Sequence, residues 1–107
     1  NLTKIKGTIV NLNSFFDLLN LKEVEEWQVE IRKKNNDPYE LDELIVYIAP
    51  KKNVDFAELK TKLKNSLKEE LEITPEIVKV ELKELLDRLG METELKEKRI
   101  VDNRPKT

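Results

Sequence analysis

The chain contains no cysteine and no histidine. These two absences exclude disulfides, thiol nucleophiles, imidazole bases and the usual zinc sites. The sequence also shows no run of roughly 18 apolar residues, as a membrane span needs, and no leader with a charged start and an apolar middle. We therefore expect a cytoplasmic protein without a membrane partner. Its chemistry must come from carboxylates, Lys, Arg, Tyr or the two serines, Ser14 and Ser66.

The sequence also has no large excess of either basic or acidic residues. The 20 basic and 22 acidic residues are interspersed along 107 positions and give a formal charge of −2. The sequence does not build the one-signed basic face that contact with a phosphate backbone requires, so nucleic acid is not an expected partner. With two Gly, four Pro and 38% apolar residues, the composition favours one regular, well-solvated domain.

Two strands are indicated by their apolar patterns. Residues 27–32 alternate apolar and polar side chains, which is the period of a half-buried strand with Trp27, Val29 and Ile31 turned inward. Residues 44–49 are apolar on both faces, which favours a strand at the centre of its sheet.

Two helices are indicated by caps and periodicity. In the clearer one, Asp55 is expected to cap the start, and leucines at every fourth position, from 59 to 71, carry the helix to about Leu71. A shorter helix is expected to start at the Asn13-Ser14 cap and to end near Leu21.

Weaker patterns complete the element order. Residues 4–10 predict one strand interrupted by Gly7, residues 78–82 a further strand, residues 84–89 a helical turn, and residues 100–101 a strand-like clip. The order strand, helix, strand, strand, helix, strand predicts an α+β fold, a ferredoxin-like βαββαβ sandwich with a C-terminal extension. Two helices then cover one face of an antiparallel sheet whose first and third strands are central.

The C-terminal stretch is the one place where spacing suggests chemistry. Lys96 and Arg99 stand three apart, ahead of an Ile-Val pair and an ending in Asp102 and Arg104. Interpreted from its residues alone, this is a solvated basic tail with one small apolar clip, because charge runs near a terminus are usually solvated.

The order Lys-x-x-Arg-Ile-Val-Asp-x-Arg also resembles a family signature. It is similar to the C-terminal Gly-Lys-x-x-Arg-Val-x-Asp-x-Arg of phenylacetate-coenzyme A ligases, which belong to the adenylate-forming superfamily. The resemblance places Lys96 on the adenylation lysine and Arg99 on the arginine that follows it. Leu95 stands where the family has glycine.

A second stretch resembles the same family near the other end of the chain. Residues 7–12 lie where the family has Gly-Val-Asn-Val-x-Pro, just after its interdomain hinge. Gly7 and Val10 match, whereas Ile9 replaces Asn and Leu12 replaces Pro. The resemblance thus implies that residues 1–107 are one C-terminal lobe, with a hinge-proximal strand in residues 1–10 and the catalytic-lysine loop and tail in residues 95–107.

The resemblance implies a ligase that works in two half-reactions. The full-length enzyme would use ATP with Mg²⁺ to convert an aryl or related carboxylate to an acyl-adenylate, and would then form a thioester with coenzyme A. Lys96 would supply the adenylation cation, and the lobe would rotate between the half-reactions. Its partner would be the N-terminal nucleotide-binding lobe of the same polypeptide. The domain alone would bind no cofactor or metal and would not be an enzyme.

The resemblance also suggests roles for other residues. Gly7, Lys98 and Arg99 would lie near substrate or nucleotide, and Lys98 is the nearby alternative to Lys96 as the catalytic cation. Asp102 and Arg104 would anchor the tail through salt bridges.

A different class of protein competes with the ligase. A stand-alone ferredoxin-like regulatory or interaction module, without catalytic activity, could pair with a second copy through its sheet. The strand at residues 44–49 supports this alternative, because its second apolar face needs cover. The sequence does not indicate the acyl substrate, since the pocket that selects it would lie in the other lobe.

Overall fold

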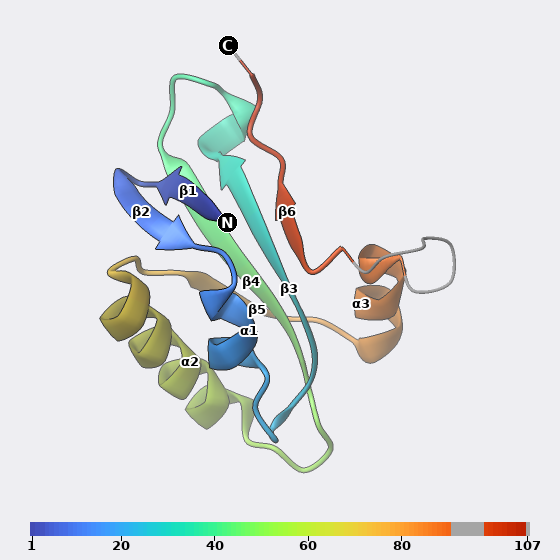
Figure 1. Cartoon of the computed structure of the whole chain (residues 1–107). Coiled ribbons are helices and arrows are strands. Elements are labelled where there is room, and N and C mark those ends of the chain that lie inside the picture. The colour runs from blue at the N-terminus through green and yellow to red at the C-terminus, as the bar shows by residue number, and fades with distance from the viewer. Residues whose placement is uncertain (91–97, 107) are drawn as a thin grey trace.

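The computed structural model describes residues 1–90 and 98–106, and it has the predicted α+β class (Figure 1). In chain order the elements are β1 (Leu2–Ile5), β2 (Thr8–Asn11), α1 (Ser14–Leu19), β3 (Val24–Lys33), the 3-10 turn η1 (Lys34–Asn36), β4 (Asp42–Pro50), α2 (Phe56–Leu71), β5 (Glu76–Lys79), α3 (Leu82–Leu89) and β6 (Ile100–Asp102).

Four strands form one sheet in the order β5-β4-β3-β6. β3 and β4 form a long antiparallel hairpin, and β4 is central, as the pattern of residues 44–49 predicted. The pairs β4 with β5 and β3 with β6 are parallel, so the prediction of an antiparallel sheet is wrong for these pairs. The chain reverses direction through α2 between β4 and β5, and such a crossover returns the next strand parallel to the first.

The N-terminal residues do not form the single strand predicted at 4–10. β1 and β2 pair with each other in a separate two-stranded sheet, in which Ile5 pairs with Thr8. The two residues between them have positive φ, 51° at Lys6 and 79° at Gly7, as a type I′ hairpin turn requires. Gly7 is therefore a turn residue, and the central position expected for a first strand belongs to β3.

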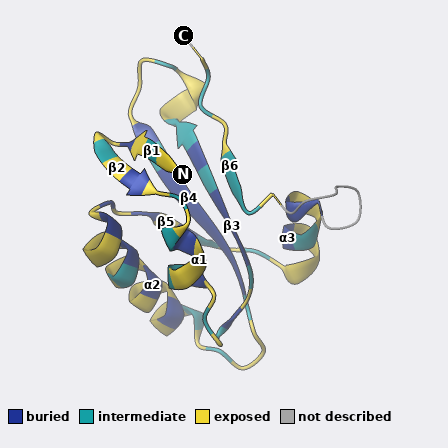
Figure 2. Cartoon of the chain, in the orientation of Figure 1, coloured by how far each residue is buried: buried dark blue, intermediate teal, exposed yellow. Residues whose placement is uncertain are grey.

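The first face of the sheet packs on α1 and α2, so the two predicted helices lie on one face (Figure 2). Trp27, Val29 and Ile31 of β3 point into this core, as their alternation predicted, and α2 adds its repeated leucines. α1 is shorter than expected and ends at Leu19, where Asn20 leaves the helical conformation.

The predicted start of α2 is confirmed by its cap. The Asp55 carboxylate accepts the Glu58 N–H at 3.3 Å. The Asn13 side chain makes no such bond at the start of α1; instead Asn11 Oδ1 accepts the Asn13 N–H at 3.0 Å.

The second face of the sheet is covered in part by α3. Leu85 and Leu89 of this helix pack on Ile45, Tyr47 and Ala49 of β4. The cover that the apolar strand needs on this side therefore comes from the same chain.

The strand predicted at residues 78–82 is wrong in its bounds. β5 ends at Lys79, and Leu82 begins the helix. Gly90 ends the helix with a φ of 72°, in the left-handed conformation that commonly follows a helix. Within the described ranges, no helix has the length and apolar content needed to cross a membrane.

Candidate functional site

The described tail lies along the edge of β3. β6 runs parallel to β3. The residues just before and just after β6 in the chain are also hydrogen-bonded to β3. The Val29 N–H donates to Arg99 O at 2.7 Å, and the Asn103 N–H donates to Ile31 O at 2.8 Å. The tail is thus built into the sheet as a strand.

The predicted catalytic residue, Lys96, lies outside the described residues, as does Leu95. One hydrogen bond joins the chain before this segment to the chain after it. The Lys98 N–H donates to Leu89 O at 3.0 Å, which ties the start of the described tail to the last residue of α3.

Gln28 reinforces this junction from β3. Its side-chain nitrogen donates to Lys98 O at 2.9 Å and to Arg88 O at 3.1 Å. Its Oε1 accepts a hydrogen bond from Arg88 Nε at 3.2 Å. Because both ends of the amide are used, burial of this residue to 4% exposure leaves its polar atoms satisfied.

Arg99 of the signature contacts β3 from the edge. Its Nη1 donates to Trp27 O at 2.9 Å, and its Nη2 donates to the Glu26 carboxylate at 2.7 and 3.2 Å. The guanidinium carbon lies 5.3 Å from the centre of the Trp27 ring, within range of a cation–π contact. These contacts hold the tail at its entry into the sheet, and a place near nucleotide stays a prediction.

Lys98 lines a cavity of about 210 Å³ on the second face of the sheet, the side that carries α3. Its other lining residues are Gln28, Glu30, Arg88, Val101 and Asn103. All of these lining residues except Val101 are polar or charged, and both cations come from the junction between α3 and the tail. This is the described region nearest in sequence to Lys96.

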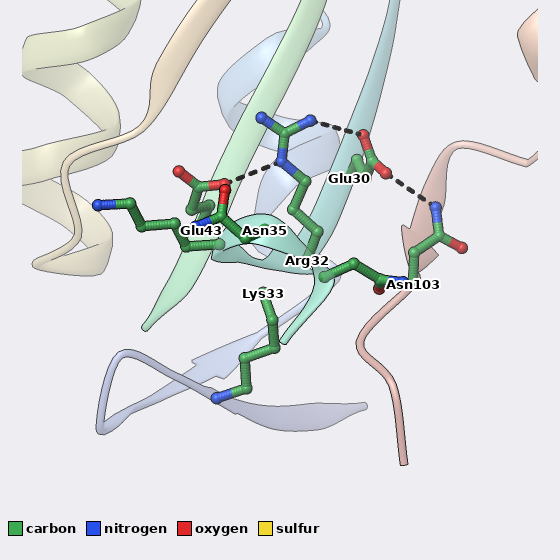
Figure 3. A pocket seen from close by; sticks show the side chains of 8 residues that line it. Glu30, Arg32, Lys33, Asn35, Glu43 and Asn103 are labelled. Carbon is green, nitrogen blue, oxygen red and sulfur yellow. Dashed lines mark hydrogen bonds and ion pairs between the residues drawn. The ribbon is translucent and has the colours of Figure 1, made fainter. Parts of the chain in front are cut away.

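A second polar cavity, of about 510 Å³, shares Glu30 and Asn103 with the first (Figure 3). The Arg32 guanidinium points between two carboxylates, with Nε 3.0 Å from Glu43 Oε1 and Nη1 3.9 Å from Glu30 Oε1. Asn103 donates to Glu30 Oε2 at 2.9 Å. Ion pairs and a hydrogen bond therefore connect four of the residues that line this cavity.

Glu30 joins the two cavities and is held ionised. Burial raises the pKa of Glu30, but hydrogen bonds from Tyr47 and Asn103, and the charges of Arg32 and Arg88, more than offset it and leave the pKa below its usual value. Tyr47 donates to it at 2.7 Å. A carboxylate stabilised in this way is a structural acceptor, since a general acid or base works best with a pKa near the operating pH.

The end of the tail reaches the N-terminal hairpin. Arg104 Nη2 and Nε donate to the Asp102 carboxylate at 2.7 and 3.0 Å. The same guanidinium contacts the hairpin through Lys4 O at 2.7 Å and Thr3 Oγ1 at 3.1 Å. It also pairs with Asp42 at 3.2 Å. The structure therefore brings Arg104, at the end of the C-terminal stretch that resembles the ligase family, against the hairpin that contains Gly7 and Val10 of the N-terminal stretch.

Sequence reasoning identified Arg99, Asp102 and Arg104 of the tail but missed Gln28 and Asp42, which also bind the tail. From the sequence, Gln28 is expected to be a solvent-facing polar residue of an alternating strand. Asp42 is expected to be a solvated residue before an apolar strand. Their roles depend on contacts more than 60 positions away in the chain. Local periodicity carries no signal for such contacts.

Comparison with known proteins bears on the fold. No family model and no curated sequence matches the chain. A solved domain of phenylacetate-coenzyme A ligase from Bacteroides vulgatus matches it with a TM-score of 0.73 and 18% identity, over 100% of this chain and 96% of that one. The chain has the fold of an acyl-CoA ligase domain. The resemblance inferred from the two motifs is thus confirmed at the level of fold.

The ligase-domain fold also matches part of a larger enzyme. 2-Hydroxyisobutyryl-CoA ligase, solved with 2-HIB-AMP and CoA in the thioesterification state, matches with a TM-score of 0.71 and 17% identity over 97% of this chain. The same enzyme in the postadenylation state with 2-HIB-AMP gives 0.64 and 16% over 96%. This chain spans only 21% and 22% of those two chains, so it corresponds to a small domain of that ligase.

Proposed function

We propose that this chain is the small C-terminal domain of a carboxylate–CoA ligase of the adenylate-forming type. The observation that carries the proposal is a fold match over nearly the whole chain to CoA ligase structures, one of them a domain of similar size and the other about five times longer. The proposed acyl substrate is an aryl or related carboxylate, as in the family that the two motifs resemble. The proposed location is cytoplasmic.

The proposed contribution of the domain is a mobile cation. In the adenylation step a carboxylate oxygen attacks the α-phosphate of ATP, the bond to the β-phosphate breaks and pyrophosphate leaves. The two reacting anions repel each other. The Lys96 ammonium, placed between them, offsets this repulsion and stabilises the charge that develops in transfer. The domain then rotates, which withdraws Lys96 and opens a path for the thiol of coenzyme A.

The described part of this domain offers no cluster of ligands for the magnesium ion that accompanies ATP. In residues 1–90 and 98–106 no three acidic side chains lie together as a metal site would need. We propose that the ion and the nucleotide bind in the larger lobe of the same polypeptide, with this domain supplying Lys96 to the closed site.

The test uses the full-length polypeptide and separates the two half-reactions. Lys96→Ala should reduce ATP–pyrophosphate exchange by about 100-fold or more, the usual cost of removing a group that stabilises transition-state charge. Thioester formation from supplied acyl-adenylate and CoA should persist. Lys64→Ala, an exposed lysine on α2, is the matched control and should keep full exchange activity.

Three outcomes would change the proposal. Ordinary exchange activity in Lys96→Ala would remove Lys96 from catalysis. Loss of exchange in Lys98→Ala instead would move the assignment by two residues. A native polypeptide of only 12.6 kDa, found with an antibody against this chain, would leave Lys96 without a nucleotide site and would favour the stand-alone interaction module.

A further inference from the structure

The hairpin turn and the tail meet at one buried carboxylate. Asp42, the first residue of β4, is 9% exposed. Its Oδ2 accepts the backbone N–H of Lys6 at 2.8 Å and a hydrogen bond from Arg104 Nη1 at 3.2 Å. One oxygen therefore joins the turn at residues 6–7 to the end of the tail, although the two segments lie at opposite ends of the chain.

Arg104 is fully engaged on the other side of this contact. A guanidinium has five N–H donors in a rigid planar fork. Here Nε donates to Asp102, Nη1 to Lys4 O and Asp42, and Nη2 to Thr3 Oγ1 and Asp102. These five bonds account for every donor, and a lysine ammonium could not reproduce their geometry.

The charges at this junction are balanced. Lys33 Nζ lies 2.8 Å from Asp42 Oδ1, so the carboxylate faces a cation on each side. Burial raises the pKa of Asp42, but Lys33, the Lys6 N–H and Arg104 outweigh that effect and hold the pKa below its usual value. The junction is therefore ionised at neutral pH, and it links the hairpin, β3, β4 and the tail.

The hairpin has few other attachments. Only Ile5 and Val10 from residues 1–11 are buried, and isolated two-stranded hairpins are marginally stable in water. Contacts to Asp42 and Arg104 therefore add to the core packing of Ile5 and Val10 in attaching this hairpin to the rest of the domain.

We propose that Asp42 and Arg104 are positioning residues that lock the Lys6–Gly7 turn to the tail, so that the two stretches move as one body. The consequence for catalysis rests on the proposed function: the tail that ends at Arg104 and the turn near the hinge would keep a fixed geometry relative to each other while the domain rotates. The attachment of the turn to the tail can be tested without measuring enzyme activity.

The first experiment measures amide hydrogen exchange in the 107-residue chain. Arg104→Lys should increase exchange of the Lys6 amide and of the β1–β2 ladder by about 10- to 100-fold, the range for loss of hydrogen bonds to charged groups. Ladder amides between β3 and β4 should keep their protection. Asn103→Ala is the matched control, because Asn103 bonds to Glu30 instead of the hairpin, and it should leave hairpin exchange unchanged.

A second variant guards against general destabilisation. Asp42→Asn keeps a carbonyl oxygen for the Lys6 N–H but removes the charge that pairs with Arg104, so hairpin exchange should rise by a smaller factor than in Arg104→Lys. Unchanged hairpin exchange in both folded variants would overturn the lock. So would a loss of protection in both that is equal in the hairpin and in the β3–β4 ladder.

The second experiment uses the full-length polypeptide. If the lock positions Lys96, Arg104→Lys should lower kcat for adenylation about tenfold and leave KM for ATP unchanged, because the nucleotide is held by the other lobe. A change in KM with kcat intact would contradict a positioning role. Wild-type protein without adenylation activity would contradict only the proposed function, since the exchange experiment would still decide on the lock.

Discussion

The two faces of the four-stranded sheet carry different kinds of side chain. The first face is apolar over most of its length and is covered by α1 and α2. The second is apolar only where α3 lies on β4; beyond that it carries Gln28, Glu30 and Arg32. β3 contributes to both faces, because its residues point to them alternately. In residues 27–32 the residues on the first face are apolar and those on the second face are polar or charged.

The two faces therefore have different structural roles. Apolar burial on the first face is non-directional and stabilises the domain as a whole. Hydrogen bonds and ion pairs on the second face are directional, and they fix the place where the tail enters the sheet. Substitutions on the first face should therefore change stability most, and those on the second face should change the local order of the tail.

The largest effect is expected from Leu63→Ala on the first face. Leu63 is fully buried between α2 and the sheet, and removing a buried leucine side chain leaves a cavity that the surroundings fill only in part. The free energy of unfolding should fall by about 2–5 kcal/mol, measured by urea denaturation. Lys64→Ala, one position along on the exposed side, should stay within about 0.5 kcal/mol of wild type. Equal losses in the two variants would contradict the assignment of this face as the main core.

Gln28→Met should have a smaller effect on stability and a local effect on the tail. Methionine fills a similar volume but leaves Lys98 O and Arg88 O without the donor that they share. We expect a loss of about 1–3 kcal/mol, the cost of unsatisfied buried polar groups. Hydrogen exchange should rise at the Lys98 amide, which binds Leu89 O at this junction. Unchanged exchange at Lys98 would show that Gln28 does not hold the tail.

The same contrast explains which parts of the fold could be predicted from the sequence. The inward side of β3, the leucine repeat of α2 and the Asp55 cap all depend on residues close together in the chain. The hairpin at residues 2–11 gave a weaker signal, because the first residue of its turn is Lys6, while Asn, Asp or Gly is usual at a type I′ position with positive φ.

The site was less predictable than the fold. The tail residues could be identified because they match a spacing pattern, but their partners could not. Asp42 binds the tail only because β4 starts beside the hairpin turn, and Gln28 binds it only because β6 enters the sheet next to β3. Both placements are set by tertiary packing, which the order of elements does not specify.

The smallest expected effect is a pH dependence on the second face. The pKa of Glu30 in the folded chain lies below its usual value, so its ionised form stabilises the fold fully above the unfolded pKa of about 4.3. This contribution is lost as the pH falls through the lower folded pKa. Glu30→Gln, which cannot titrate, should therefore be less stable than wild type at pH 7, and the gap should narrow below about pH 4. Urea denaturation of both proteins from pH 7 to 3 measures this gap. A gap that widened on acidification would mean that Glu30 is destabilised by its burial and that its partners on the second face fail to compensate.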